Sequence, residues 1–526
     1  MGEPKASSVP KPDLSQFPEI PEGCCLNYNN RFNLFQVYRP IKRFDPVTGV
    51  GKWSRETIGS IKNGKFEFSA TYLLRAKNKE LTEKLAAVPE ASISDAAVPD
   101  KAAVSEEETA PPIREKQDAH EAVAQGTTAR QVQEKITGVV RQSNIDRRDP
   151  SKVEVPMETI VLGSLMNALT GNTECNAISD AICHKLKPYF QAMLPEFAVD
   201  TISHDTVRKA LMLVDTSAFE MFYAELISPL VKHTKGRIIA ADGQALRATG
   251  KAVKDRDGLR GAYMLMNFYD ATNGVCLYHR LIGQKKNEIT VGPEALSKLD
   301  IDGAIVTADA MSCQVNFVNK VLGGGAHYCL SLKGNQDKSW SEVRSLFATT
   351  PEDRQRIFRT EASVDHGRIE EYTVAVLPGR MLSKVIKEKW QALGEGSIIR
   401  VLRNAIQKKT GKQTMEERFF ITSLPLEEHT PEYMLEVTRA HWSVENNLHW
   451  MLDTRFSQDR IQANNPKYIT NRAALNKLAL AMLENYRCWL CLKGREKAEL
   501  SISQIMKRCT DPETAMECLA CGLGFI

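Results

Sequence analysis

The sequence predicts an α/β fold, and three observations carry that prediction. Two short apolar runs rich in β-branched residues, 237–241 and 304–308, are each followed by an aspartate and are typical of buried strands. Residues 156–233 have helical periodicity instead. Residues 360–425 alternate polar and apolar side chains, as inserted strands do. Strands that alternate with helical segments indicate a mixed sheet covered by helices.

At 526 residues the chain is too long for one ordinary domain. Its composition, with 42% hydrophobic and 25% charged residues, is that of a globular protein, and the net charge of +4 says little about partners. We expect these parts: a disordered arm 1–27, a small basic β-module 28–79, an acidic flexible linker 80–155, a helical domain 156–235, a catalytic domain 236–490 with a β insertion at about 360–425, and a helical tail 491–526.

The segment 28–79 combines basic and aromatic residues on predicted strands. It holds eleven Lys and Arg residues against three Asp and Glu, together with Tyr38, Trp53 and Phe66. Such a surface suits the DNA backbone. A solvated β-domain used for dimerisation or docking is the alternative, and we favour DNA contact.

Residues 80–125 are rich in Ala, Glu and Pro, so we expect an extended tether there, with a short helix within 126–154. No apolar run approaches the length of about 18 residues that a membrane span needs. The N-terminus lacks an apolar signal region, which predicts a cytoplasmic protein with reduced thiols.

Two Cys-x-x-Cys pairs lie near the C-terminus, Cys488 with Cys491 and Cys518 with Cys521. This spacing occurs in zinc sites. The residues between the cysteines are Trp-Leu and Leu-Ala, and both segments have a helical pattern, so we favour buried thiols.

The helical segment contains one candidate DNA-reading helix. Ser203 gives an N-cap signal, and Arg208 and Lys209 follow on the same helix. This pattern fits either a helix-turn-helix motif or a helical lid on the catalytic domain, and the sequence does not separate the two.

After the first aspartate strand, residues 263–269 and 275–282 predict a hairpin that turns at Asn273-Gly274. Helices are expected at 293–299 and 313–322. A strand at 327–332 leads to Lys333, Asn335 and Gln336, which are candidate phosphate or base contacts. A turn with solvated polar residues is the alternative for these three.

Three carboxylates are candidates for one site. Asp242 and Asp309 each end a predicted strand, with a turn glycine directly after Asp242. Glu445 lies on a predicted helix, 438–458, close to Trp442 and His449 at helical spacing. Carboxylates brought together repel one another unless a cation lies between them.

Carboxylates without a His/Cys ligand set suit hard ions, Mg²⁺ or Mn²⁺. Two such ions about 3.5–4 Å apart serve in-line attack on a phosphodiester. One ion activates water or a 3′-hydroxyl, and the other neutralises the leaving oxygen. The pattern therefore predicts metal-dependent phosphoryl transfer.

Six ordered blocks resemble the ISAs-type, or H-repeat-associated, insertion-sequence transposases of the DDE superfamily, over about 155–485. The sequence lacks the Tyr/Arg/Lys signature of the wider superfamily, because Thr438, His441 and Leu452 occupy its positions. The blocks are Ile239-Ala-Ala-Asp242-Gly-Gln-Ala-Leu-Arg247, Lys285-Lys-Asn287-Glu288-Ile289, Ala304-Ile-Val-Thr-Ala-Asp309-Ala-Met-Ser-Cys-Gln314, Leu332-Lys333-Gly334-Asn335-Gln336, His366-Gly367-Arg368-Ile369-Glu370, and His441-Trp442-Ser-Val-Glu445-Asn446-Asn-Leu448-His449-Trp450-Met-Leu-Asp453.

The resemblance implies a ribonuclease-H-like catalytic core with Asp242, Asp309 and Glu445 as the metal-binding triad. It also implies that the partners are element ends and target DNA, that two chains pair in a synaptic complex, and that the protein is associated with the nucleoid. We expect DNA contacts from Arg247, Lys285, Asn287, Lys333, Asn335, Gln336, Arg208 and Lys209, and supporting roles for Glu288 and His441.

His441 and His449 flank Glu445 on its helix. Either histidine could orient the glutamate or simply satisfy polar groups of the core, and for His449 we favour the second role.

Three functions fit the sequence. The first is a transposase that binds terminal inverted repeats, cleaves the DNA and joins the freed 3′-hydroxyl to a target. The second is a catalytically silent or domesticated DNA-binding protein. The third is a metal-dependent nuclease that hydrolyses DNA without joining ends. The intact triad favours the first.

Overall fold

The computed structural model divides the chain into two compact units, residues 1–109 and 110–526. In the first unit it describes residues 12, 16–17, 20, 24–29, 34–44, 51–62 and 65–68; in the second it describes 113–526 apart from 251–253, 256–257, 260–261, 283–287, 366–367 and 494–499.

The described part of the first unit is a four-stranded antiparallel sheet in the order β1-β2-β3-β4. Val37, Ile58 and Ile61 form its small core. The predicted disordered arm extended too far, because β1 pairs with β2 from Cys25 onward. The strands are β1 (Cys25–Asn29), β2 (Leu34–Phe44), β3 (Gly51–Lys62) and β4 (Lys65–Phe68).

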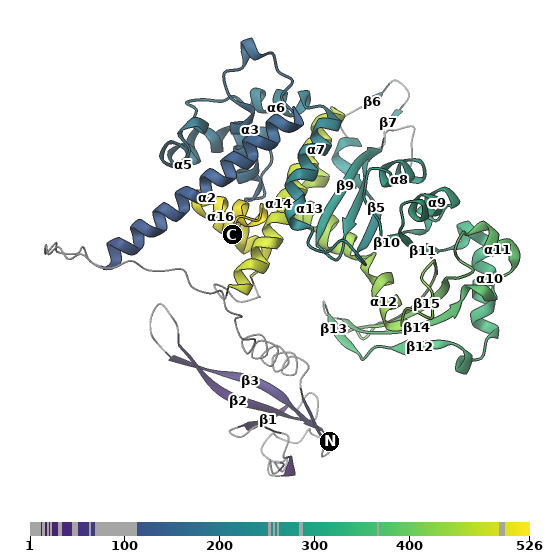
Figure 1. The fold of residues 1–526 in the computed structure, drawn as a ribbon. Helices are drawn as coiled ribbons and strands as arrows, with labels where there is room; N and C mark the ends of the chain where they lie inside the picture. The colour runs from purple at the N-terminus through teal and green to yellow at the C-terminus, as the bar shows by residue number, and fades with distance from the viewer. Residues whose placement is uncertain are drawn as a thin grey trace, which may run out of the picture. The chain divides into compact units, whose positions relative to one another are not determined.

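A large mixed sheet is the centre of the second unit (Figure 1). Its order is β12-β14-β15-β16-β11-β10-β5-β8-β9, with β13 paired to β14. The inserted strands therefore continue the sheet. The strands are β5 (Ile238–Leu246), β8 (Tyr263–Asp270), β9 (Val275–Ile282), β10 (Ile305–Ala308), β11 (His327–Leu332), β12 (Arg356–Arg359), β13 (Ser363–Asp365), β14 (Arg368–Pro378), β15 (Ser397–Gln407) and β16 (Gln413–Thr422).

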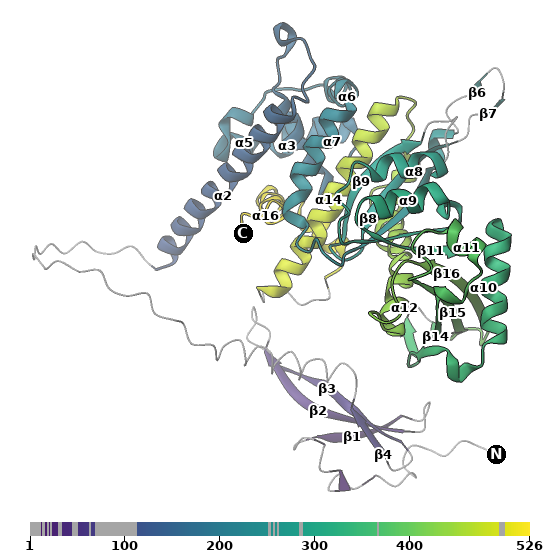
Figure 2. The same cartoon turned by 45° about the vertical axis from the view of Figure 1, so that its right-hand side comes forward.

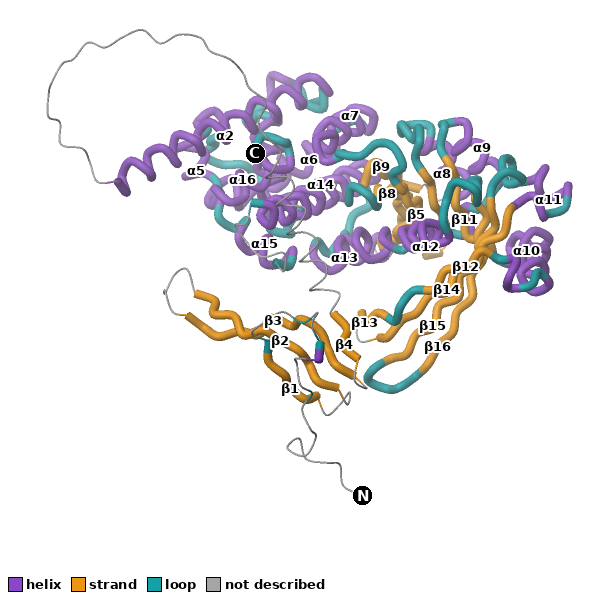
Figure 3. Tube along the Cα trace, turned by 60° about the horizontal axis from the view of Figure 1, so that its bottom comes forward, coloured by secondary structure: helices purple, strands orange, loops and turns teal. Residues whose placement is uncertain are grey.

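The alternation of side chains along β5 and β10 assigns one face of this sheet to the candidate site. Ile238 and Ile305 are paired in register and pack in a core cluster with residues of α12 (Pro431–Ala440). The intervening Ile239 and Val306 belong to the larger cluster that includes α8 (Glu288–Leu296) and α9 (Val315–Gly323). Successive side chains of a strand point to opposite faces, so α12 covers the face of Ile238 and Ile305 (Figure 3).

The helices that precede the sheet pack together with the C-terminal helices. The long helix α14 contacts α3, α6, α7, α15 and α16 as well as strand β9 (Figure 2). These helices are α2 (Ile113–Ser143), α3 (Met157–Ala168), α4 (Cys175–Asp180), α5 (Lys187–Met193), α6 (His204–Leu213), α7 (Thr216–Ile227), α14 (Pro466–Leu492), α15 (Ile502–Arg508) and α16 (Pro512–Gly522).

Helix α2 corrects the prediction of a flexible linker up to residue 155. The linker's composition hides an apolar stripe, and Ala129, Val132, Ile136, Val139 and Val140 are all buried. Their spacing places them on one side of a helix, which packs against α3, α7 and α16. Tertiary packing thus orders a segment whose charge and Ala content favoured a tether.

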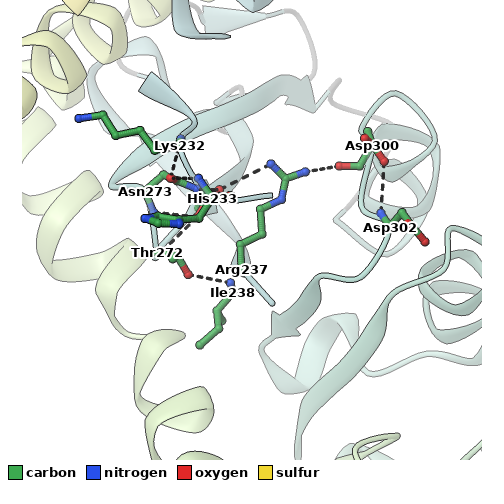
Figure 4. Close-up of polar contacts among 9 residues, drawn as sticks. Lys232, His233, Arg237, Ile238, Thr272, Asn273, Asp300 and Asp302 are labelled. Carbon is green, nitrogen blue, oxygen red and sulfur yellow. Dashed lines mark hydrogen bonds and ion pairs between the residues drawn. The ribbon is translucent and has the colours of Figure 1, made fainter. Parts of the chain in front are cut away.

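A polar cluster fixes the beginning of β5 to the β8–β9 turn (Figure 4). The Asn273 carboxamide oxygen accepts the backbone N–H groups of Lys232 and His233 at 2.9 and 3.0 Å. Its Nδ2 donates to Asp270 at 2.7 Å, and the Arg237 guanidinium lies 3.8 Å from the same carboxylate. Both ends of this buried ion pair have partners, which buried charges require.

In the C-terminal helices the Cys518 thiol lies beside the thiol of Cys509, and both are buried. Cys518 and Cys521 are buried, Cys491 is half-buried and Cys488 is exposed. Burial raises the pKa of the Cys521 thiol to about 12, as expected for an unreactive core residue. Within the described residues, none of the helices has both the length and the apolar content to cross a membrane.

Candidate active site

The two aspartates lie at neighbouring positions on adjacent parallel strands. Strand β5 pairs with β10 up to Ala241 and Ala308, and Asp242 and Asp309 are the next residue of each chain segment. Neighbouring strands are about 4.8 Å apart, so the two residues are close at the backbone. Both belong to the sheet face covered by α12, because they follow Ile238 and Ile305 by four positions.

The strand bearing Asp242 does not end there. Asp242 pairs with Asn267 in an antiparallel ladder that continues to Leu246 and Tyr263. The expected turn at Gly243 is therefore wrong, because pairing with β8 holds the backbone extended.

Asp309 directly follows β10, as the sequence predicted. Its Oδ1 accepts the Ala310 backbone N–H at 2.6 Å and lies 3.2 Å from the Lys333 ammonium. Burial by itself would raise the pKa of Asp309, but the Ala310 hydrogen bond and the Lys333 charge outweigh it and hold the pKa below its ordinary value. The carboxylate is charged at neutral pH.

Glu445 lies on an interrupted helix rather than the continuous one predicted for 438–458. Helix α12 ends at Ala440, a wide π-helical turn spans Val444–His449, and α13 occupies Trp450–Arg455. The π turn packs against β5. Positions four apart lie near the same side of either kind of helix, so His441, Glu445 and His449 lie along one face of this segment.

The two histidines of this face reach the two aspartate strands. His441 is buried, and its Nδ1 lies 3.4 Å from the Thr307 hydroxyl on β10. The His449 Nδ1 lies 3.6 Å from the Asp242 Oδ2. Burial lowers the pKa of His441 to about 4 and that of His449 to about 3, so both rings are neutral near pH 7.

Glu445 is exposed and lines a cleft of about 1000 Å³ between its own helix and the inserted strands. Among the described residues around this cleft, neither Asp242 nor Asp309 is part of the lining. The cleft carries two stacked pairs: the Arg418 guanidinium lies 4.2 Å from the Trp442 ring centre, and Arg439 lies 4.5 Å from Tyr372. Flat cationic and aromatic groups of this kind are suited to nucleic acid.

The donor chemistry of the aspartate pair fits a hard divalent cation, although the three acids do not converge. Within the part of the chain that the structure describes, no three His, Cys, Asp or Glu side chains form a metal-binding group. Asp309 contacts the Lys333 ammonium instead. Carboxylate oxygens are preferred ligands of Mg²⁺ and Mn²⁺, and a bound cation offsets the repulsion between two neighbouring carboxylates.

The residues that follow β11 hold the neighbouring loop in place and also supply the Lys333 charge to the site. Asn335 Nδ2 donates to the Ala310 carbonyl at 2.7 Å, and Gln336 Nε2 donates to the Cys313 carbonyl at 2.9 Å. These amides hold the loop that follows Asp309. Lys333 remains exposed beside the carboxylate.

The other predicted site residues lie further out or beyond the described residues. Arg247 is exposed directly after β5. Arg208 and Lys209 are exposed on α6, where Ser203 is the predicted N-cap and Arg208 pairs with Asp205 at 2.8 Å. Helix α6 packs on α4 and α14, which leaves both the groove-reading and the lid interpretation open. Lys285 and Asn287 are outside the described residues, and Glu288 is the first residue of α8.

Sequence reasoning missed Asn267, whereas the role it favoured for His449, contact with polar groups of the core, agrees with the structure. The Asn267 Nδ2 lies 2.9 Å from the His449 Nε2, and Asn267 is fully buried. A polar amide in the otherwise apolar run 265–269 was the one available signal for Asn267. Its significance depends on the register that places it opposite Asp242.

Comparison with known proteins matches the part of the chain that holds these residues. A family model described as a transposase DDE domain matches residues 233–482, which include both aspartates and Glu445. Relatives named as H repeat-associated putative transposases match as well. The chain is therefore similar to the H-repeat-associated DDE transposases.

Relatives in Escherichia coli match much of the chain. "Putative transposase YncI" of strain O157:H7 is 27% identical over 386 residues, which are 70% of this chain and 93% of that protein. "H repeat-associated putative transposase YhhI" of strain K12 is 25% identical over 343 residues, 65% of this chain and 88% of that protein. A DDE transposase domain implies a ribonuclease-H-like core and DNA as the partner.

Proposed function

We propose that this transposase binds the terminal repeats of its own insertion sequence, cleaves the DNA there and transfers the freed strand to a target. Asp242, Asp309 and Glu445 are the catalytic acids of this proposal. The observation that carries it is the placement of Asp242 and Asp309 side by side on parallel strands, under the helix that bears Glu445.

The three acids would hold Mg²⁺ or Mn²⁺, which supply an activated water or 3′-hydroxyl and stabilise the leaving oxygen. The Ala310 hydrogen bond and the Lys333 charge both lower the pKa of the Asp309 carboxyl. The loop amides of Asn335 and Gln336 keep that carboxylate at the end of β10.

DNA would lie along the cleft that Glu445 lines. Arg439, stacked on Tyr372, would contact phosphates and unpaired bases. Arg418, stacked on Trp442, donates to Glu416 at 2.6 Å and would exchange this partner for a phosphate. Lys333 and Arg247 supply further positive charge near the strand ends. The strands of the first unit, with their basic and aromatic residues, contribute sequence-independent affinity.

The test uses a plasmid that carries the gene's own flanking DNA, incubated with the purified full-length chain and Mg²⁺ or Mn²⁺. Asp309→Asn removes one catalytic charge with almost no change in shape. Asp353→Asn, at an exposed position in a short turn, is the matched control. We expect cuts at the element ends and joined products with wild type and Asp353→Asn, and neither with Asp309→Asn.

Different outcomes separate the alternatives. Cuts at the ends without joined products identify a hydrolytic nuclease. Specific binding without cuts in either metal identifies a silent DNA-binding protein. Cuts that survive Asp309→Asn contradict the assignment of the catalytic acids.

A further inference from the structure

A polar row crosses the sheet beneath the site. Asn267 on β8 pairs in register with Asp242 on β5 and with His279 on β9. Paired residues of neighbouring strands point to the same face. The row continues the line of Asp309 and Asp242 across two more strands, on the face covered by the His449 turn and by α14.

The contact between Asn267 and His449 fixes the proton of the imidazole. The Asn267 Nδ2 lies 2.9 Å from the His449 Nε2. An amide NH₂ group only donates, so Nε2 is the acceptor and the ring proton is on Nδ1. This Nδ1 is the atom that lies 3.6 Å from the Asp242 Oδ2.

Burial makes this arrangement rigid. Asn267 has no exposed surface and the His449 side chain is 12% exposed. An imidazole held with its N–H toward Asp242 limits the directions that this carboxylate can take.

We propose that Asn267 and His449 are positioning residues that hold the Asp242 carboxylate in the orientation in which it binds a divalent cation. The proposal rests on the assignment of Asp242 as a metal ligand. Polar groups that lie against a metal-binding carboxylate set its direction, and losing such outer partners weakens metal affinity about 10- to 100-fold.

The test measures Mn²⁺ binding to the full-length chain by electron paramagnetic resonance of the free ion, without DNA and without turnover. We expect His449→Leu and Asn267→Leu to bind Mn²⁺ about 10- to 100-fold more weakly than wild type. His449→Asn restores most of the affinity, because the Asn Nδ2 is as many bonds from the backbone as the imidazole Nδ1. His429→Leu, a half-buried histidine stacked on Tyr433, is the matched control and binds as wild type does.

Asp242→Asn separates this proposal from the proposed function. If Asp242→Asn loses Mn²⁺ while both leucine variants bind as wild type does, the positioning role is wrong and the catalytic assignment stands. If Asp242→Asn binds Mn²⁺ normally and still cuts DNA, the catalytic assignment fails. Thermal unfolding verifies that each variant is folded. Should the leucine variants unfold, Asn267→Ser and His449→Asn are compared instead. A Mn²⁺ affinity lowered equally in these two variants contradicts the proposal that asparagine can replace His449.

Discussion

At the scale of single residues, Lys477 places a charged side chain in a buried position. This lysine is 1% exposed on α14, and its Nζ has no hydrogen-bond partner among the described residues. Burial lowers its pKa to about 8, although Cys276 acts in the opposite direction. A buried cation without a partner lowers the free energy of unfolding.

We predict that Lys477→Met stabilises the chain at pH 7, by up to about 3 kcal/mol for a pKa lowered from 10.5 to about 8. The folded chain binds this proton less tightly than the unfolded chain, so wild-type stability rises as the pH increases from 8 toward 10.5, and the advantage of the variant shrinks there. Urea unfolding at pH 7 and pH 10 measures both effects.

Lys467→Met, at an exposed position of the same helix, controls for the loss of a charge and should change little at either pH. Equal stability of Lys477→Met and wild type at pH 7 would contradict a cost for the buried ammonium.

At the scale of elements, the π turn Val444–His449 decides which side chains meet the sheet. Removing one residue from the turn would rotate His449 and α13 by about 100° relative to Glu445, because each helical residue turns the chain by that angle. The two short helices that flank the turn, α12 and α13, are fixed by buried residues such as Met434 and Leu452. The wide turn is therefore where the register of the site is set.

We predict that deleting Asn447 converts this turn to an α-helical one and lowers DNA cleavage about 100-fold or more, because small displacements of catalytic groups have effects of that size. The substitution Asn446→Ala keeps the length of the turn and should retain cleavage. Cleavage assays on flanking DNA compare the two. Full activity of the deletion variant would show that the π turn has no part in placing Glu445.

At the scale of the whole molecule, buried hydrogen bonds connect the catalytic strand to the helical part. Gln244, two residues after Asp242 on β5, accepts from Gln458 at 2.6 Å. Gln458 accepts from Asn476 at 3.1 Å, and Asn476 accepts from Thr173 at 2.8 Å. The second unit is thus joined by polar contacts as well as by its apolar core, because each buried group needs its partner.

We predict that the chain from Ala110 onward stays folded and binds flanking DNA more weakly and with less salt dependence than the full chain. The described strands of the first unit have their own core, and each lost phosphate contact lowers the slope of log affinity against log salt by about 0.9. Binding titrations at several salt concentrations measure the slope. An unchanged slope would indicate that the basic module serves dimerisation or docking.

Local patterns in the sequence determined the strands and turns. The strand at 327–332 and the hairpin around Asn273-Gly274 are confirmed, because a short apolar run and a glycine with positive φ are local properties. The Ser203 cap is confirmed for the same reason. The helix expected within 126–154 is present, but α2 already begins at Ile113, and its packing against helices distant in the sequence is not a local property.

Tertiary structure alone decided the neighbourhood of each acid. The adjacency of Asp242 and Asp309 requires two strands more than sixty residues apart to pair in parallel, which only the crossover between them arranges. The extension of β5 beyond Asp242 depends on β8, and the meeting of Asn267 with His449 depends on a helix far along the chain. The sequence determined which residue types carry the chemistry, whereas register and helix packing determined which of them meet, because contacts between distant segments depend on the whole core.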